Sequence, residues 1–431
     1  MTIYTKPCLP IPEPLRGAEI GSFAHYTVTV RLPNIARQVL AENAYPQHAV
    51  AGLETLINEI PAGPIRPLND GAAPDSVEWA GFLAPYLGWN WLDITWLFAE
   101  AYFYRRILEA VGYFESGPGQ GRDPYTSQKR QGLERDLDTI RAFCTQVKGW
   151  VKTAQNEPAR LPELLEGSLK VNLWGNQADL SMWPIGKEKP GSKIASAIKY
   201  ESSKKSSRPD HDTALQQEDH LLVDDAEDVA GYLASLADQP VRVDLILDNA
   251  GLELVYDLGL ADFLLSSQVA REVYFHLKSF PTFVSDATIA DVRQTVSFLV
   301  AEARPDVRAL AVRLKGYLDD GRLHLQDGLY WTSPLSFWEA PSHMIEELSH
   351  SDLLISKGDA NYRRLLGDRY WPYITPLADI LCYLPAPLAA LRVLKSEVAA
   401  GLKPGQPESL DRADPGWKTN GKWGVLQFVR V

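Results

Sequence analysis

Polar residues that could do chemistry follow an apolar run in the second half of the sequence. Asp248 and Asn249 come directly after the run 241–247, and Glu253 lies in the first turn of the helix expected next. Ligands of open α/β sheets bind beyond the carboxyl ends of the strands, so these residues are candidates for a site. Their oxygen atoms suit Mg²⁺ or Mn²⁺. The alternative is that Asp248 or Asn249 only caps the helix.

Asp286 stands in a similar place after the apolar run 271–277 and before a helix expected from Ile289. An acidic residue there often caps the helix, and this alternative stays open. With Asp248 and Asn249 on a neighbouring strand, Asp286 would instead complete a set of two carboxylates and one amide. Such a set favours a divalent cation and leaves positions for water and a phosphate oxygen.

A third segment, 357–364, follows the apolar run 352–355. Gly358 lets the backbone approach a ligand, and the free amides at a helix start attract anions. Lys357 and Arg363 add positive charge, so we expect the segment to bind a phosphate or sugar phosphate. The alternative is an ordinary turn from strand to helix with solvated basic residues.

The elements that must position these residues alternate between apolar runs and helical patterns, which predicts an α/β fold with a mostly parallel sheet flanked by helices. The first half of the chain has helical periodicity instead and predicts a helical N-terminal lobe. We expect this lobe over 1–186, a polar loop or linker over 187–220 and an α/β metal-binding catalytic domain over 221–431. The remaining expected strands are 388–394 and 423–429, and the expected helices are 50–60, 76–87, 89–114, 127–151, 252–266, 289–302 and 305–318.

The composition excludes several classes of protein. The 431 residues carry a net charge of −12, which opposes binding to nucleic acid. No apolar run approaches the ~18 residues of a membrane span and no signal core is present, so we expect a cytoplasmic protein, with the nucleus as a second location, and no membrane partner.

Cys8, Cys144 and Cys382 are far apart, which argues against a disulfide framework or a CxxC metal site, so a metal would use oxygen or imidazole ligands. The oligomeric state is not predicted.

Three strings of the sequence together resemble the metal-dependent damage-control phosphatases, once known only as a domain of unknown function. They are LDNAGLELVYDL at 247–258, PTFVSDAT at 281–288 and SKGDANYRRLLGD at 356–368. Further similar segments lie at 89–108, 173–181 and 421–428, so the resemblance extends over nearly the whole chain.

The resemblance implies that Asp248, Asn249 and Asp286 hold a divalent metal, Mn²⁺ or Mg²⁺, with Co²⁺ and Ni²⁺ as further options. It implies that Glu253 lines the same pocket, so these four residues are the catalytic candidates. The residues implied to contact the substrate are Asp359, Ala360, Asn361, Tyr362, Arg363 and, for its phosphate, Lys395.

The subfamily most similar to this sequence resembles enzymes that hydrolyse reactive sugar phosphates such as fructose 1-phosphate and fructose 6-phosphate. Its C-terminal signature is Arg-Thr-x-Lys, whereas this chain has Val393 between Arg392 and Leu394, so the hydroxyl is absent and both cations remain. This departure bears on substrate preference. The implied partner is a small phosphorylated metabolite.

We favour direct attack by water, with Asp286 or Glu253 as the base. The candidates for closing the pocket are Glu100, Arg105 and Arg106 from the helix at 89–114, together with Asn176 and Asp179. The alternatives are that the helix residues form ion pairs on the helix surface and that the other two cap a turn.

Two other functions remain as alternatives. The human relative is also described as an acidic residue methyltransferase, which suggests transfer of a methyl group from S-adenosylmethionine to protein glutamate. The glycine-rich turn expected for that cofactor is missing after the first strand. The other alternative is a non-catalytic protein that binds sugar phosphates.

Overall fold

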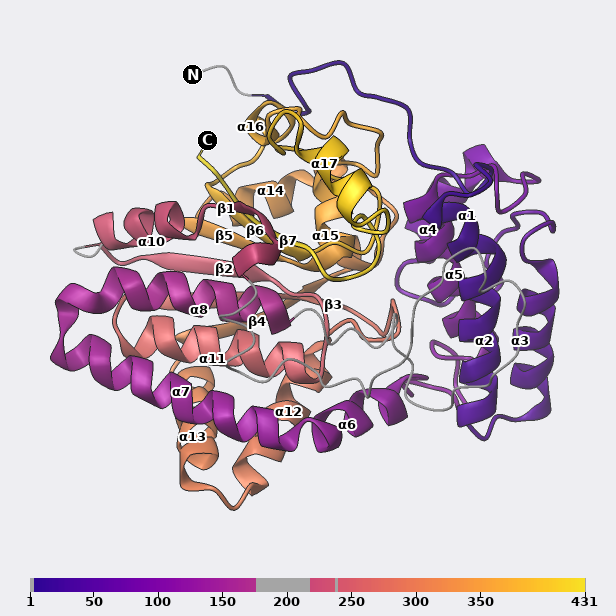
Figure 1. Ribbon diagram of the computed structural model, residues 1–431. Helices are drawn as coiled ribbons and strands as arrows, with labels where there is room; N and C mark the ends of the chain where they lie inside the picture. Colours follow the sequence, from indigo (N-terminus) through magenta and orange to yellow (C-terminus); the bar gives the residue numbers. More distant parts are fainter. Residues whose placement is uncertain (1–3, 176–217, 237–238, 431) are drawn as a thin grey trace.

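The computed structural model describes residues 4–175, 218–236 and 239–430, which form a helical lobe beside an α/β domain (Figure 1). The predicted fold class is confirmed, because the described residues form a mostly parallel sheet flanked by helices. Neighbouring strands of this sheet run parallel except for β6 and β7, which are antiparallel. In spatial order the strands are β1 (Leu221–Asp224), β7 (Gly424–Val429), β6 (Leu388–Val393), β5 (Leu353–Lys357), β2 (Arg242–Ile246), β3 (Glu272–Lys278) and β4 (Leu323–Gly328).

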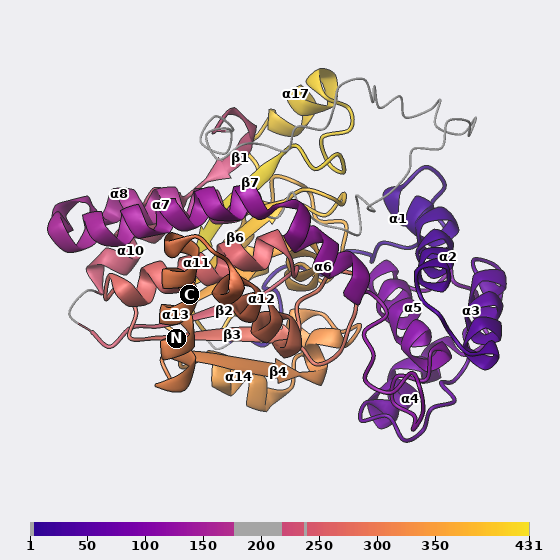
Figure 2. The same cartoon turned by 90° about the horizontal axis from the view of Figure 1, so that it is seen from below.

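Helices cover both faces of the sheet (Figure 2). One face packs against the helices α7 (Leu137–Asn156), α8 (Leu161–Gly175), α10 (Ala226–Ser235), α11 (Leu252–Ser266), α12 (Ile289–Ala301) and α13 (Pro305–Asp319). The other face shares its core with the helical lobe and with α14 (Ser342–Leu348), α15 (Gly358–Leu365), α16 (Leu377–Ile380) and α17 (Gln406–Ala413).

The helical lobe is smaller than the predicted span of 1–186. Its elements are α1 (Phe23–Tyr26), a π-helical turn (Thr27–Arg31), α2 (Leu32–Glu42), α3 (Gln47–Glu59), α4 (Ser76–Leu83) and α5 (Trp96–Ala110).

The expected helix at 127–151 is interrupted at Asp136, which separates α6 (Thr126–Arg135) from α7. From there the chain leaves the lobe, and α7 and α8 pack on the sheet domain. Phe143 of α7 lies so close to Gly259 of α11 that a Cβ at Gly259 would overlap its ring. The apolar stripe of α7 therefore belongs to the core of the α/β domain, and the expected boundary at 186 is wrong. Most of the predicted polar loop lies outside the described residues.

The N-terminal segment crosses the α/β domain before it enters the lobe. The Leu15 amide donates to the Asp368 carbonyl at 2.9 Å, and the Trp96 amide donates to the Leu15 carbonyl at 2.9 Å. A disulfide joins Cys8 to Cys382, whose Cα atoms are 6.4 Å apart. The expectation that no disulfide forms is therefore corrected: these cysteines are distant in sequence, and the path of the N-terminal segment brings them together.

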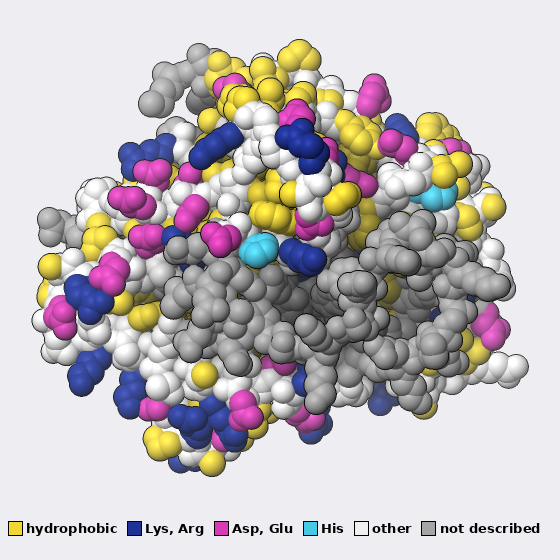
Figure 3. All heavy atoms as spheres, in the orientation of Figure 1, with side chains coloured by type: hydrophobic (Ala, Val, Ile, Leu, Met, Phe, Trp, Pro, Cys, Tyr) yellow, Lys and Arg dark blue, Asp and Glu magenta, His cyan; other side chains and the backbone are white. Residues whose placement is uncertain are grey.

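The face of the molecule in Figure 3 shows acidic and basic side chains intermixed over its described part, with no continuous basic patch there. Among the described residues, no helix combines the length and the apolar character that crossing a bilayer requires.

Candidate active site

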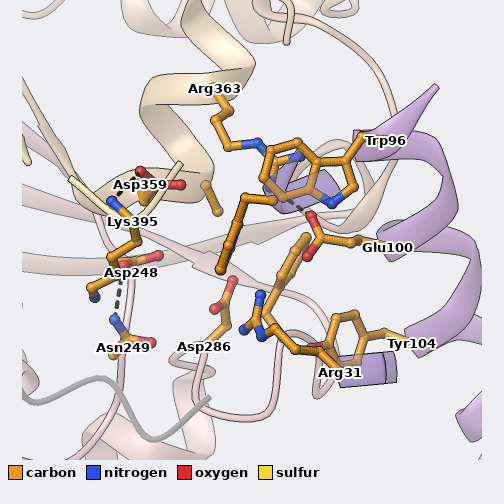
Figure 4. A pocket seen from close by; sticks show the side chains of 13 residues that line it. Arg31, Trp96, Glu100, Tyr104, Asp248, Asn249, Asp286, Asp359, Arg363 and Lys395 are labelled. Atoms are coloured by element: carbon orange, nitrogen blue, oxygen red, sulfur yellow. Dashed lines mark hydrogen bonds and ion pairs between the residues drawn. The ribbon is translucent and has the colours of Figure 1, made fainter. Parts of the chain in front are cut away.

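A pocket lies where the carboxyl ends of β2, β3, β5 and β6 face the helical lobe (Figure 4). The α/β domain contributes the acidic residues expected from the sequence together with cations that follow β5 and β6. The lobe contributes aromatic side chains and two charged residues. The lining residues are Asp248, Asn249, Phe283, Asp286, Asp359, Ala360, Arg363 and Lys395 from the α/β domain and Phe23, Arg31, Trp96, Glu100 and Tyr104 from the lobe.

The backbone holds the three predicted metal ligands together. The loops after β2 and β3 form an isolated antiparallel bridge between Asn249 and Asp286. The Ala250 amide donates to the Ser285 carbonyl at 2.7 Å, and the Ala287 amide donates to the Asp248 carbonyl at 2.8 Å. Because these bonds flank both acidic positions, the three residues come from one hydrogen-bonded pair of loops.

The capping alternatives are not what the structure shows. The N-cap residue of α11 is Gly251, which has no side chain to cap with, so Asp248 and Asn249 are not its caps. The N-cap residue of α12 is Thr288, whose hydroxyl accepts from the Asp291 amide in a capping box. Asp286 lies before this cap, and its side chain lines the pocket.

The turn before Asp286 has an unusual backbone. Phe283 and Val284 both have positive φ angles, 48° and 69°. Such conformations cost non-glycine residues energy and persist where the surrounding structure enforces them, often at functional sites. This turn redirects the chain after β3 so that Asp286 faces the end of β2.

Lys278, the last residue of β3, was not predicted. Its Nζ lies 3.3 Å from Asp286 Oδ2 and donates to Asn361 Oδ1 at 3.4 Å. A polar residue that ends an apolar strand is the same signal that identified Asp248, so the sequence contains the information to find Lys278.

Glu253 and Lys357 lie behind the pocket and do not line it, which corrects their predicted places. Glu253 Oε2 accepts from Asn249 Nδ2 at 2.8 Å, so it holds the amide that faces the pocket. Lys357 is fully buried, and its Nζ donates to Asp257 Oδ1 and the Asn172 carbonyl, both at 2.9 Å. The side chain of Lys357 points to the sheet face covered by α8 and α11, away from the pocket.

The pKa values in this buried group follow from burial and charge. Burial raises the pKa of Asp257 more than the nearby Lys357 ammonium lowers it. Burial acts to lower the pKa of Lys357, but the carboxylates of Asp257 and Glu253 outweigh it, so this pKa is raised. Lys357 therefore remains a cation that compensates buried negative charge.

Only part of the segment predicted to contact the substrate lines the pocket. Asp359, Ala360 and Arg363 line the pocket. Asn361 donates to the Leu247 carbonyl at 3.0 Å, so it ties α15 to the end of β2. Tyr362 is buried, and its hydroxyl donates to Gln427 on β7. These last two residues support the site from behind.

Asp359 and Arg363 are both held in their charged forms. Burial acts to raise the pKa of Asp359, but the Arg392 and Arg363 guanidinium groups outweigh it and leave this pKa below its ordinary value. Burial acts to lower the pKa of Arg363, but Asp368 and Glu100 outweigh it and raise this pKa. The guanidinium carbon of Arg363 lies 3.5 Å from the centre of the Trp96 ring, where a cation–π interaction is favourable.

Lys395 lines the pocket from the loop after β6. Its amide donates to Asp359 Oδ1 at 3.1 Å, and the same oxygen accepts from Arg392 Nε at 2.8 Å. Val393, which stands where the resemblance led us to expect a threonine, is fully buried in the core between the sheet and its helices. Its side chain does not line the pocket, so the replacement affects packing.

The helical lobe contributes residues that sequence reasoning missed. Arg31 ends the π-helical turn and points toward Asp286 (Figure 4), and its guanidinium lies 5.2 Å from the Phe23 ring centre. Tyr104 packs against Phe283 with ring centres 4.9 Å apart. π-helical turns within helices often occur at functional sites. No strand precedes Arg31 within residues 4–30, so the signal that identified the other residues does not apply to it.

Of the candidates for closing the pocket that the structure describes, only Glu100 lines it. Burial raises its pKa more than the Arg363 and Arg31 guanidinium groups lower it. Arg105 is buried in ion pairs with Asp70 and Asp75, and Arg106 bonds Glu59, Glu109 and the Tyr102 hydroxyl, so both stabilise the lobe. Asn176 and Asp179 lie outside the described residues.

The donor atoms of the pocket fit a hard divalent cation. Asp248, Asn249 and Asp286 present two carboxylates and an amide on adjoining loops, each no more than 4% exposed. Within the described ranges, no cluster of three His, Cys, Asp or Glu side chains is placed to hold a metal ion, so the set depends on the amide of Asn249. Four carboxyl groups and three cationic side chains line the pocket, so a bound divalent cation would make it attractive to a phosphate.

These features define an α/β protein with a pocket at its strand ends, where carboxylate and amide oxygens lie beside basic side chains. The family model described as the damage-control phosphatase ARMT1-like domain matches residues 27–410. The chain belongs to this family.

Several relatives align along nearly their whole length. Damage-control phosphatase ARMT1 of Danio rerio is 34% identical over 452 residues, which cover 97% of this chain and 97% of the relative. The Homo sapiens protein of the same name is 30% identical over 456 residues, covering 97% and 98%. A crystal structure of a DUF89 family protein from Pyrococcus horikoshii aligns with a TM-score of 0.42 and 13% identity, covering 92% of this chain and 95% of that one.

Proposed function

We propose that this protein is a metal-dependent phosphatase that hydrolyses small sugar phosphates such as fructose 1-phosphate and fructose 6-phosphate. The observation that supports it most is the meeting of Asp248, Asn249 and Asp286 with Lys395 in one pocket of a chain from this family. Oxygen ligands and a cation at the end of a parallel sheet are the parts that phosphoryl transfer requires.

Asp248, Asn249 and Asp286 would hold the metal ion, with Mn²⁺ or Mg²⁺ as the expected metals and Co²⁺ or Ni²⁺ as further options. The bound cation would withdraw charge from the phosphoryl group and increase the acidity of a water molecule. Glu253 would keep the Asn249 amide in place through its hydrogen bond.

Lys395 would bind the phosphate and compensate the charge that builds up on its oxygens during transfer. Arg363 is fixed by Asp368, Glu100 and Trp96, so it would contribute a stationary positive charge. The aromatic residues of the lobe would exclude water from the reacting group.

Water is the proposed nucleophile. Of the two carboxylates considered as its base, only Asp286 lines the pocket, since Glu253 lies behind Asn249. Asp286 would accept the proton of the attacking water, and the sugar oxygen would leave from the opposite side of the phosphorus atom and take up a proton from solvent.

The test is phosphate release from a panel of sugar phosphates by the metal-stripped protein and after addition of Mn²⁺, Co²⁺, Ni²⁺ or Mg²⁺. We expect release only with metal, and a loss of roughly a hundredfold in kcat/KM for Lys395→Met. Lys148→Met is the matched control, because Lys148 is exposed on α7 and pairs with Asp306. Absence of release with every metal, together with methyl transfer from S-adenosylmethionine, would contradict the proposal.

A further inference from the structure

Lys129 on α6 is a buried cation outside the pocket that contacts the backbone of a pocket residue. It is 5% exposed. Its Nζ donates to the Asp286 carbonyl at 3.0 Å, to Asp291 Oδ2 at 2.8 Å and to Asp123 Oδ2 at 2.9 Å. One ammonium group therefore bonds three acceptors, two in the segment from Asp286 to Asp291 and one in the loop before α6, which uses all of its donors.

The contact with Asp291 ties Lys129 to the start of α12. Asp291 Oδ2 also accepts from the Thr288 amide at 2.9 Å and from the Thr288 hydroxyl at 2.7 Å. Lys129 thus bonds the carbonyl of Asp286 and the capping box that follows it. Both ends of the short segment from Asp286 to Asp291 are attached to the same ammonium.

This segment follows the two residues with positive φ, Phe283 and Val284, whose conformation requires support from outside the turn. A charged donor makes a strong hydrogen bond to the Asp286 carbonyl, which restrains the peptide plane that follows and so the backbone from which the Asp286 side chain projects. Hydrogen bonds behind a metal ligand commonly determine its orientation.

The residues around Lys129 also form hydrogen bonds with the helical lobe. The neighbouring Gln128 donates from Nε2 to Glu42 Oε2 at 2.8 Å, and Asn43 donates from Nδ2 to the Pro124 carbonyl at 3.0 Å. Glu42 ends α2. In both ribbon views α6 lies between the lobe and the α/β domain (Figures 1 and 2).

We propose that Lys129 is a positioning residue that couples the helical lobe to Asp286. Through it, the placement of α6 against α2 determines how Asp286 is presented to the metal and the substrate. The inference rests on the proposed metal-dependent function, and it adds a route by which a change in the lobe would regulate the site. Lys129 itself touches neither the substrate nor the metal.

The test compares Lys129→Met with Arg105→Met, a matched loss of a buried cation on the lobe that has no contact with the pocket. Mn²⁺ binding is measured by electron paramagnetic resonance without substrate. We expect Lys129→Met to weaken Mn²⁺ binding by roughly 10- to 100-fold, as loss of a residue behind a metal ligand commonly does. Arg105→Met is expected to retain the wild-type affinity, and Lys129→Arg, which keeps the cation, to recover part of the loss.

Amide hydrogen exchange of the turn gives a second readout that needs no metal. We expect the segment 282–291 to exchange at least tenfold faster in Lys129→Met, while the strands of the sheet keep their protection. If Lys129→Met does not fold, Gln128→Ala breaks the link to Glu42 without burying a charge and is expected to weaken Mn²⁺ binding at least twofold.

The outcomes separate this inference from the proposed function. Wild-type affinity and wild-type exchange in Lys129→Met would overturn the coupling and leave the phosphatase proposal standing. A wild-type protein that binds no Mn²⁺ would contradict the metal site, and the exchange of 282–291 would then decide by itself whether Lys129 positions the turn.

Discussion

Asp248→Asn is expected to lower kcat for phosphate release by roughly 10³-fold or more while the protein stays folded. The change keeps the shape of the side chain and removes one of the two anionic ligands proposed for the metal. Asp248 is 4% exposed and accepts from Asn249 Nδ2 at 2.8 Å, so solvent cannot substitute for the lost charge. Steady-state kinetics with saturating Mn²⁺, together with a thermal melt, measure both parts of the expectation.

Gly358→Ala offers a second way to disturb the same carboxylate. Gly358 has a φ of 84°, and a Cβ there would overlap the Asp248 carboxylate. We expect Gly358→Ala to lose activity as Asp248→Asn does. Gly316→Ala, at a position where a Cβ meets open space, is expected to keep its activity. Activity within tenfold of the wild type in Asp248→Asn would show that Asp248 is not a metal ligand.

Lys357→Met is expected to lower the free energy of unfolding by roughly 3–5 kcal/mol at neutral pH. Lys357 is fully buried between Asp257, Glu253 and the Asn172 carbonyl, and the methionine leaves these groups without their cation. An uncompensated buried carboxylate is among the most destabilising consequences of a single substitution. Urea unfolding at several pH values measures the effect.

The loss should depend on pH in a defined direction. The folded-state pKa of Asp257 is already above its ordinary value, because burial outweighs Lys357, and removal of Lys357 raises it further. A carboxyl group with a raised pKa binds more protons in the folded state, so stability falls as the pH rises above the unfolded pKa of about 3.9 and through the folded one. The difference between wild type and Lys357→Met is therefore expected to be small near pH 4 and to grow toward neutral pH.

Asp257→Asn provides the control for this prediction. Combined with Lys357→Met, it removes the carboxylate that the lysine compensates, so the double variant should be more stable at neutral pH than Lys357→Met alone. Equal stability of Lys357→Met and the wild type across this pH range would contradict the buried charge pair.

The strands that surround the site could be predicted because their apolar runs are nearly continuous, as in parallel strands covered on both faces. The run 241–247 became β2 (Arg242–Ile246), and the run 271–277 became β3 (Glu272–Lys278). β4 escaped notice because four of its six residues are polar or glycine and most of it is only half-buried at the edge of the sheet.

Positions at the strand ends were predictable, but the direction of each side chain was not. Lys357 and Asp359 are two residues apart, yet the helix that begins at Gly358 turns Asp359 toward the pocket and leaves Lys357 behind it. The distinction depends on the residue at which β5 ends, which periodicity does not locate. Sequence reasoning treated both as substrate contacts.

Long-range contacts account for the other features that the sequence did not predict. Arg31 reaches the pocket from a different lobe, and Lys129 reaches the Asp286 turn across 157 residues. The disulfide joins Cys8 and Cys382 across 374 residues. Neither spacing nor residue type shows that such positions meet, because the packing of the lobe against the sheet decides it.

The most direct test of the account is a crystal of the protein with Mn²⁺ and inorganic phosphate, analysed by anomalous scattering at the manganese edge. The proposed function predicts one manganese peak bounded by Asp248, Asn249 and Asp286, with phosphate beside it in contact with Lys395. A peak elsewhere, or phosphate bound away from Lys395, would contradict the central claim that these residues form a metal-dependent phosphatase site.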